Sequence, residues 1–170
     1  LGDVYKRQEY TNDPFVIAQH KGMISINATI EVDLTGQACS ESIGGMQYSG
    51  TGGQVDFVRG AMMADGGQSF LATHATAKDG AVSCVVGSLS PGSVVTTART
   101  DIDMLVTEFG IAELRGRSLR DKVPRVLLCN RRRLADREPA FAESVDTRVD
   151  PPPRRRVFRA NNQAVVDMDI

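Results

Sequence analysis

The stretch GGMQYSGTGGQVDFVRGAMMADGGQSFLATHA, residues 44–75, contains a glycine-rich loop, a helical pattern and a strand pattern in succession. Apolar residues at 57, 58, 61 and 62 recur at helical spacing. They predict a helix over Asp56–Ala64 that ends at the glycine pair 66–67. Residues 69–75 follow as a predicted strand. A helix that leads directly into a strand indicates a layered α/β domain.

Further strand patterns lie on both sides of this stretch. They are short, and most alternate apolar with polar side chains, as a strand with one buried face does. Ser118 is placed to cap a helix that begins at Leu119. We therefore expect an open, layered α/β fold with a mixed sheet and flanking helices. The predicted strands are residues 23–27, 29–34, 37–42, 69–75, 81–89 and 104–110.

Composition excludes several classes of protein. The 170 residues include 20 Lys and Arg against 21 Asp and Glu, so the net charge of −1 argues against a strongly basic nucleic-acid binder. No run reaches the roughly 18 apolar residues of a membrane helix. The three cysteines at 39, 84 and 129 form no CxxC pair, so neither a metal site nor a disulfide framework is predicted. The polar opening residues lack a secretion signal, and we expect a cytoplasmic location.

Charge divides the chain into three parts. Residues 12–120 have 7 basic and 11 acidic side chains, whereas 121–170 have 11 basic and 8 acidic ones. The last part also contains arginine runs at 131–133 and 154–156. An arginine-rich extension is compatible with a solvated tail, an arm for an acidic partner, or translation in a shifted reading frame.

The glycine-rich loop is the first candidate for chemistry. Glycines at 44, 45, 50, 52 and 53 directly precede the predicted helix. Unpaired N–H groups at a helix start carry partial positive charge and favour phosphate, carboxylate or a developing oxyanion. The pattern is neither a Walker A sequence nor a dinucleotide fingerprint. Close packing of strand and helix backbones explains the glycines equally well.

Acidic residues provide further candidates. Glu108 ends the apolar run MLVT, so a partly buried carboxylate is expected there. It is a candidate for acid–base or positioning work, or a structural partner of Arg115 or Arg117. Asp56 and Arg59 lie three residues apart and suggest a local ion pair. The single histidines show no ligand spacing.

Three blocks of the chain resemble a known family. NDPFVIAQHKGMISINATIEVDLTGQACSESIGG, GTGGQVDFVRGA and VTEFGIAELRGRSLRDK resemble the C-terminal domain of the acetyl-CoA hydrolase/transferase family, and among its members the 4-hydroxybutyrate CoA-transferase-like enzymes. The resemblance runs from about Asn12 to Lys122. It implies part of the second of two open α/β domains.

The resemblance also implies a reaction. Such enzymes move coenzyme A between acyl groups through a glutamate that attacks the thioester, which is nucleophilic catalysis by a carboxylate. The family's nucleophile lies upstream of the matched region, so no glutamate here inherits that role, Glu41 included. Coenzyme A is then a substrate and no bound cofactor is needed. The implied partners are an acyl-CoA, a small carboxylate, the missing N-terminal domain and a second subunit of a homodimer, with no nucleic acid and no membrane.

Site residues follow from the resemblance position by position. Gly53 resembles the glycine whose N–H donates to the thioester oxygen. Asn12 and Glu108 resemble residues that position the nucleophile and the acyl group. The implied contacts to coenzyme A come from Ile30, Ser49, Gly53 and Lys78.

The resemblance also divides the chain. Residues 1–11 are expected to be a non-native or disordered leader, 12–122 a partial CoA-transferase domain, and 123–170 a disordered or frameshifted tail. The parent protein is then expected to be an enzyme. The fragment alone is expected to be inactive, because it lacks the nucleophile. Two other functions stay open, an acyl-CoA hydrolase and a non-catalytic anion- or nucleotide-binding α/β module.

Overall fold

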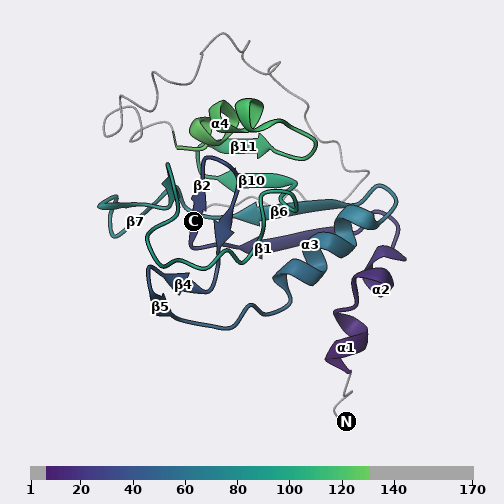
Figure 1. Cartoon of the computed structure of the whole chain (residues 1–170). Helices are drawn as coiled ribbons and strands as arrows, with labels where there is room; N and C mark the ends of the chain where they lie inside the picture. The colour runs from purple at the N-terminus through teal and green to yellow at the C-terminus, as the bar shows by residue number, and fades with distance from the viewer. Residues whose placement is uncertain (1–6, 131–170) are drawn as a thin grey trace.

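The computed structural model describes residues 7–130, and its centre is a four-stranded sheet (Figure 1). The strand order is β1-β6-β10-β11. The first three strands are parallel, and β11 returns antiparallel to β10. Their bounds are β1 Ile24–Ala28, β6 Gln68–Ala72, β10 Met104–Thr107 and β11 Gly110–Glu113.

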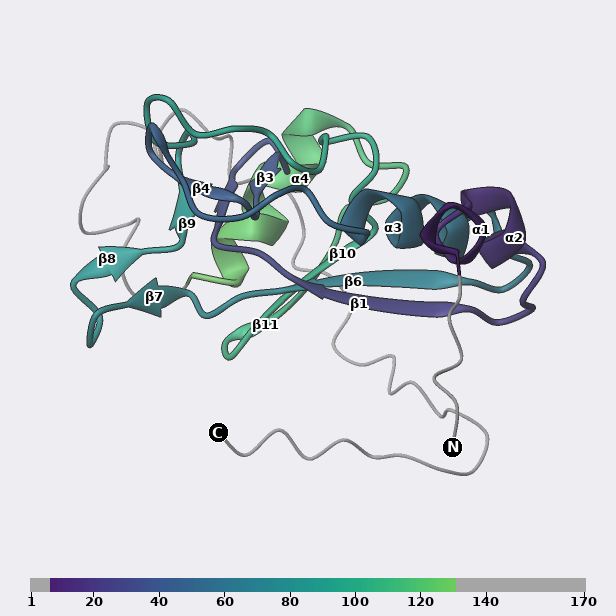
Figure 2. The ribbon, with the colours of Figure 1, turned by 90° about the horizontal axis from the view of Figure 1, so that it is seen from below.

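Four described helices accompany this sheet: α1 Gln8–Thr11, α2 Pro14–Ala18, α3 Gln54–Met63 and α4 Leu119–Leu128. Helix α3 packs on β1 and β6, α2 packs against α3, and α4 packs against β11. Figure 2 shows α3 and α4 on the same side of the sheet. The Ser118 side chain accepts the Asp121 N–H and caps α4, as predicted.

Shorter strands build a second, smaller layer. A three-stranded sheet has the order β3-β2-β9, from Ala38–Cys39, Glu31–Asp33 and Val85–Val86. Two hairpins complete it: β4 Ser42–Ile43 with β5 Met46–Gln47, and β7 Thr76–Ala77 with β8 Val82–Ser83.

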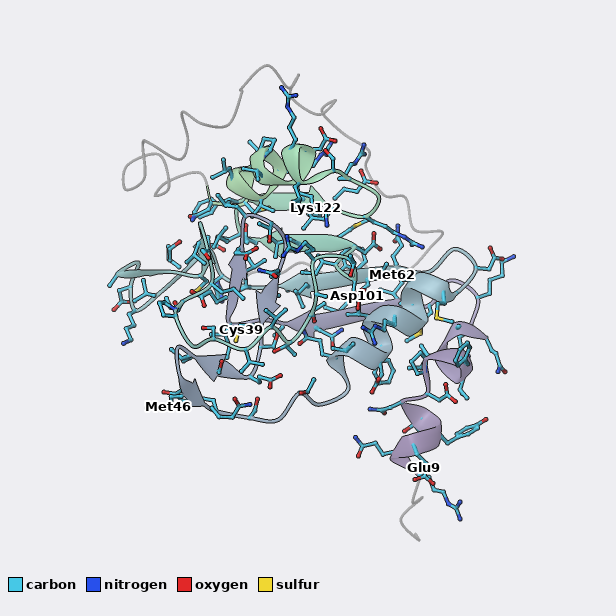
Figure 3. The ribbon with its side chains drawn as sticks, in the orientation of Figure 1. Glu9, Cys39, Met46, Met62, Asp101 and Lys122 are labelled. Carbon is cyan, nitrogen blue, oxygen red and sulfur yellow. The ribbon has the colours of Figure 1, made fainter. Side chains whose placement is uncertain are left out.

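The apolar core lies between the sheets and α4. It joins Val32 and Val85 of the small sheet to Leu71 and Leu105 of the large one, and Val126 of α4 closes it. Lys122, which Figure 3 labels beside α4, is also buried. Its ammonium group donates to the Arg99 carbonyl. Burial, together with the nearby Arg99 charge, lowers the pKa of Lys122.

The mixed α/β architecture predicted from sequence is confirmed. Four details were wrong, and the first is the strand predicted over 37–42, which is β3 and the first residue of β4 with a break between them. The single strand predicted over 81–89 is two strands, β8 and β9, separated at Cys84. The predicted glycine-rich loop, which carries the glycines at 44–53, contains part of the β4–β5 hairpin. Strand β11 was not predicted. Gly110 follows a turn at Glu108 and Phe109, and that turn reverses the chain where one continuous strand was expected.

Two of the predicted domain limits can be compared with the helices of the structure. Helix α4 runs to Leu128, so the limit at residue 122 falls inside a helix. Helix α1 lies within the expected leader. The arginine runs 131–133 and 154–156 lie outside the described residues. Among residues 7–130, no helix has the length and apolar character that crossing a membrane requires.

Candidate functional site

The glycine-rich loop ends at the first turn of α3. Gly53 occupies the N-cap position of this helix, and no side chain caps it. Gly52 has φ of +59°, a backbone conformation that favours glycine. Within residues 7–130, the N–H groups of Thr51, Gly52 and Gly53 donate to no acceptor. These amides therefore remain available to an anionic or carbonyl ligand at the positive end of the helix.

Asn12 lies directly against Gly53. A Cβ atom added at Gly53 would stand 2.6 Å from the Asn12 Nδ2 atom. Asn12 follows α1 as its C-cap, and its Oδ1 atom accepts from the Thr11 hydroxyl at 3.3 Å. The fold thus brings two predicted site residues into contact although 41 positions separate them. A side chain at position 53 would displace the Asn12 amide from this place.

Two consecutive threonines hold the glycine-rich loop at its two ends. The Thr96 hydroxyl donates to the Glu41 carboxylate at 2.9 Å, where the loop begins. The Gln54 amide donates to the Thr97 hydroxyl at 2.8 Å, where α3 begins. Gln54 is 9% exposed and Thr97 is fully buried. Because the second bond fixes the first helical residue, it also fixes the position of Gly53.

Glu41 organises the start of the same loop. Its backbone carbonyl accepts the N–H groups of Tyr48 and Ser49. Its carboxylate accepts from Gln47 at 3.1 Å as well as from Thr96. These hydrogen bonds favour the ionised form and lower the pKa of Glu41, although burial opposes them. All these bonds are internal to the fold, which gives Glu41 a structural role.

Glu108 differs from its expected environment. It is exposed rather than buried, in the turn between β10 and β11. Its carboxylate accepts the Ala75 N–H at 2.9 Å. Neither expected arginine pairs with it, because Arg117 binds Glu113 at 3.0 Å and Arg115 donates to the Met62 carbonyl. The expected Asp56–Arg59 pair is also wrong, since Arg59 binds Asp101 at 2.8 Å.

The remaining predicted contacts lie next to β2, on the glycine-rich loop and in the turn of the β7–β8 hairpin. Ile30 precedes β2 instead of lying in a strand, and its N–H is occupied by the Cys39 carbonyl at 3.0 Å. Ser49 is exposed, and its hydroxyl donates to the Gly50 carbonyl at 3.1 Å. Lys78 is exposed in the turn that joins β7 to β8, and no described acidic residue forms an ion pair with it.

The parallel strands explain which candidates share an edge. Glu108 follows the carboxyl end of β10, and the segment that contains Ala75 follows that of β6. Helix α3 leads into β6 and packs on it. Its start, with Gly53, therefore faces the same edge of the sheet. Ligands of open α/β sheets bind at this edge.

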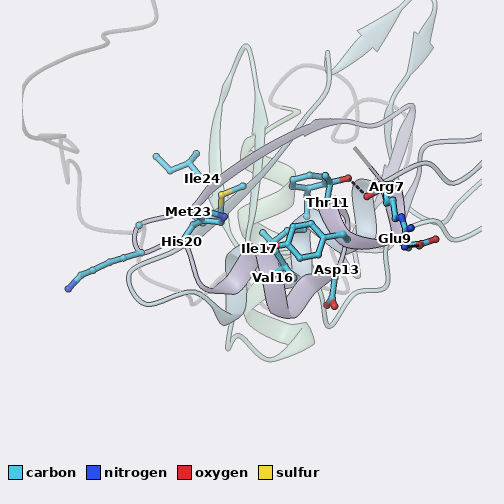
Figure 4. Close-up of a pocket in the computed structure, with 13 residues that line it drawn as sticks. Arg7, Glu9, Thr11, Asp13, Val16, Ile17, His20, Met23 and Ile24 are labelled. Carbon is cyan, nitrogen blue, oxygen red and sulfur yellow. Dashed lines mark hydrogen bonds and ion pairs between the residues drawn. The ribbon is translucent and has the colours of Figure 1, made fainter. Parts of the chain in front are cut away.

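A cavity beside the first two helices lies elsewhere. It has a volume of about 1180 Å³ and lies beside α1, α2 and the first residue of β1 (Figure 4). Tyr10, His20, Ile24 and Phe57 contribute to its lining, whereas none of the six predicted site residues does. The edge that carries Gly53 and Glu108 is therefore not part of this cavity.

Sequence reasoning missed the residues that hold the loop. Gln54, Thr96 and Thr97 belong to no recognisable motif, and both hydrogen bonds join positions more than 40 residues apart. The one local signal was a polar residue, Gln54, at the start of an otherwise apolar helix face.

Comparison with known proteins gives consistent results. Residues 4–131 match the model of the acetyl-CoA hydrolase/transferase C-terminal domain. A succinyl-CoA:cyclohexane-1-carboxylate CoA transferase of Geobacter metallireducens is 54% identical over 114 residues, which are 67% of this chain and 26% of that protein. A 4-hydroxybutyrate coenzyme A transferase of Clostridium kluyveri is 49% identical over 114 residues, 67% of this chain and 27% of that protein.

Solved structures agree with these relatives. The crystal structure of RipA from Yersinia pestis matches with a TM-score of 0.73 and 42% identity, over 80% of this chain and 30% of that one. A 4-hydroxybutyrate CoA-transferase from Porphyromonas gingivalis matches with a TM-score of 0.59 and 34% identity, over 81% of this chain and 30% of that one. The chain therefore spans about a quarter of the length of the curated relatives.

Proposed function

The chain belongs to the acetyl-CoA hydrolase/transferase C-terminal domain family, and we propose that it supplies the coenzyme A-binding and oxyanion half of an acyl-CoA:carboxylate CoA-transferase. The substrates are an acyl-CoA and a small carboxylate of the 4-hydroxybutyrate, acetate or butyrate type. The nucleophilic glutamate belongs to the part of the relatives' length that the chain does not span.

The unpaired amide of Gly53 is the observation that carries this proposal. It stands at the N-terminus of α3 with no acceptor among the described residues. When a carboxylate attacks a thioester, the carbonyl oxygen gains negative charge. A fixed N–H at a helix start stabilises that charge more strongly in the transition state than in the ground state.

Asn12 and Glu108 have supporting roles in the proposed site. The Asn12 amide, which lies against Gly53, orients the attacking glutamate and the acyl group. Glu108, held by the Ala75 N–H, shapes the acyl end of the same edge. The attack forms an acyl-glutamyl anhydride and releases the CoA thiolate. The thiolate then attacks the glutamyl carbonyl of the anhydride, which gives a glutamyl-CoA thioester and releases the first carboxylate. The second carboxylate attacks this thioester to form a new acyl-glutamyl anhydride and frees the thiolate, which attacks the acyl carbonyl to give the new acyl-CoA and the free glutamate.

Lys78 is proposed to bind the phosphates of coenzyme A. An exposed ammonium group on a hairpin turn, without a described acidic partner, suits a phosphate as a mobile point charge. Ser49 lies on the same loop as Gly53 and offers a hydroxyl near the amides. The backbone carbonyl of Ile30 is proposed to contact the pantetheine arm, because the Ile30 N–H already donates to the Cys39 carbonyl.

The setting of the parent enzyme is part of the proposal. It acts in the cytoplasm as a homodimer, with coenzyme A as substrate and no bound cofactor. The three free cysteines agree with a reducing compartment. Residues 7–130 by themselves are expected to be inactive, because the proposed nucleophile belongs to the part of the relatives' length that the chain does not span.

Hydrolysis is the second candidate, because one relative is named an acetyl-CoA hydrolase. That protein, from Kluyveromyces lactis, is 30% identical over 124 residues. Transferase and hydrolase share the glutamyl intermediate and differ in whether a carboxylate or water resolves it. The more similar relatives are named transferases, so we favour transfer.

A chimera tests the proposal. Residues 7–130 replace the matched segment of the Clostridium kluyveri relative, and exchange of coenzyme A between an acyl-CoA and a labelled carboxylate is measured. We expect exchange to be restored. Gly53→Pro removes the N–H and should lower kcat by about 10²–10³, the usual effect of losing one oxyanion donor.

The matched control is Gly50→Pro, which alters a glycine of the same loop that has no positive φ and open space around an added Cβ. Circular dichroism shows whether each variant is folded. Full exchange by a folded Gly53→Pro chimera would refute the oxyanion role. Release of free acid without exchange would favour the hydrolase.

A further inference from the structure

A buried carboxylate on β2 holds a distant turn of the chain. Glu31 is 8% exposed, and its carboxylate accepts the Ser90 hydroxyl at 2.6 Å, the Ser90 N–H at 3.1 Å and the Ser93 hydroxyl at 3.2 Å. The Ser93 N–H closes the turn onto the Ser90 carbonyl at 2.9 Å. A buried charge needs hydrogen bonds of this kind, and bonds to a charged acceptor are among the stronger ones. Glu31 therefore fixes this turn to β2.

The turn over residues 90–93, which we call the clamp turn, packs on the glycine-rich loop. A Cβ atom added at Gly92 would stand 3.0 Å from the backbone N and Cα atoms of Gly45. The Pro91 carbonyl oxygen lies 3.6 Å from the place of a Cβ atom at Gly44. Backbone meets backbone here, so a shift of the clamp turn must also shift the loop.

The chain that follows the clamp turn continues along the same loop. The Val94 N–H donates to the Ser42 hydroxyl at 3.0 Å and so joins this segment to β4. Further on, the two threonines described above bind both ends of the loop. Figure 1 shows the loop leading from β5 into α3. Residues 90–97 therefore follow the loop from β4 to the start of α3, and Glu31 anchors their first residue.

We propose that Glu31 is a positioning residue for the coenzyme A site, because through the clamp turn it holds the glycine-rich loop and the free amides at its end. This inference rests on the proposed function. Glu31 directly follows Ile30, the proposed pantetheine contact. One carboxylate thus fixes the loop relative to the strand beside the pantetheine arm. Donors that stabilise a transition state must be held in place before the reaction, and a buried anchor provides this.

Hydrogen exchange of the full chain tests the anchor independently of activity. Glu31→Ala removes the acceptor that the clamp turn needs. We expect faster exchange at the N–H groups of Tyr48 and Ser49, which donate to a carbonyl within the loop. Gly92→Ala should have the same effect, because the added Cβ pushes the clamp turn away from the loop and leaves Glu31 intact.

Asp33→Ala is the matched control. Asp33 lies two residues further along β2, is 2% exposed, and also holds a turn through its carboxylate. It accepts the Thr35 N–H at 2.9 Å and the Gln37 side-chain amide at 2.8 Å. That turn joins β2 to β3, whereas the clamp turn packs on the glycine-rich loop. Asp33→Ala should therefore leave the exchange of the two loop amides unchanged.

Kinetics of the chimera test whether the anchor serves the reaction. Glu31→Ala should lower kcat of the folded chimera about 10- to 100-fold, because small displacements of a site are costly. KM for the acyl-CoA should change little, since the loop amides act mainly in the transition state. Glu31→Gln keeps an acceptor for the Ser90 N–H and should recover most of the rate. In a Gly53→Pro background, Glu31→Ala should have little further effect, because the donor that it positions is already lost.

Several results would overturn the proposal. Unchanged exchange of the two loop amides in both Glu31→Ala and Gly92→Ala would show that the clamp turn does not hold the loop. Faster exchange with full kcat, or a loss of rate that adds to that of Gly53→Pro, would leave Glu31 a structural role only. The same effects from Asp33→Ala would indicate a general loss of stability. A chimera that transfers no coenzyme A before any substitution would count against the proposed function, and hydrogen exchange would still decide whether Glu31 holds the loop.

Discussion

The hydrogen bond between Gln54 and Thr97 is the best test of how the fold positions Gly53. The two side chains meet at 2.8 Å in a buried site. Thr97→Val keeps the shape but leaves the Gln54 amide without an acceptor. A buried donor without a partner costs about 1–3 kcal/mol. Gln54→Leu leaves the Thr97 hydroxyl alone and should cost a similar amount.

The double variant distinguishes a hydrogen bond from two independent packing effects. When apolar groups of similar shape replace both partners, the net cost is expected to be small. The double variant should therefore be more stable than the sum of the single effects indicates, with a coupling of about 1 kcal/mol or more. Urea unfolding of the full chain, followed by circular dichroism, measures the free energy of unfolding.

Additivity would refute the reasoning. If the double variant loses as much unfolding free energy as the two single variants together, to within about 0.5 kcal/mol, the two side chains do not act as a unit. A changed slope of the unfolding free energy against urea would mean that the compactness of a state had changed, and the cycle could not be interpreted. Thr100→Val is the matched control, because Thr100 is an exposed threonine three residues further along the chain.

Three other predictions concern packing, pH and thiol chemistry. Gly60→Ala should destabilise the chain by about 1–3 kcal/mol in urea unfolding, because the added Cβ would stand 2.5 Å from Ile17 Cγ2 where α2 crosses α3; no loss of stability would contradict that close approach. The lowered pKa of Glu41 contributes stability that is present above about pH 4.3 and lost as the pH falls through the folded-state value. Glu41→Gln should therefore flatten the acid limb of a plot of melting temperature against pH, and an unchanged limb would exclude Glu41. Burial raises the pKa of Cys129 to about 11, so mass spectrometry should find this thiol unmodified after iodoacetamide treatment of the native chain at pH 8 and modified in urea.

Local patterns in the sequence predicted most of the secondary structure. The apolar spacing at 57, 58, 61 and 62 predicted a helix over Asp56–Ala64, and α3 spans Gln54–Met63. Alternation predicted β1 and β2, and a serine at the right distance predicted the start of α4. These elements depend on interactions within a few residues, so their signals are visible in the chain itself.

The site was predicted only in part. The glycines predicted a loop that a ligand could approach. The family resemblance identified Gly53 and Asn12 as candidate site residues. Their contact across 41 positions could not be derived from spacing. Glu108 was expected to be partly buried because it ends an apolar run. The chain turns at that residue, and the turn leaves its side chain exposed.

The sequence by itself determined helices α3 and α4, the principal strands, the family and the glycine-rich loop, because the signal for each of these lies in residues close together along the chain. Tertiary structure decided which amides remained unpaired, which threonines hold the loop, and which turn packs on it. Those properties depend on contacts such as Gln54 with Thr97 and on the order of strands in the sheet. Such contacts form only in the complete tertiary fold, because their packing and hydrogen bonding depend on residues far apart along the chain.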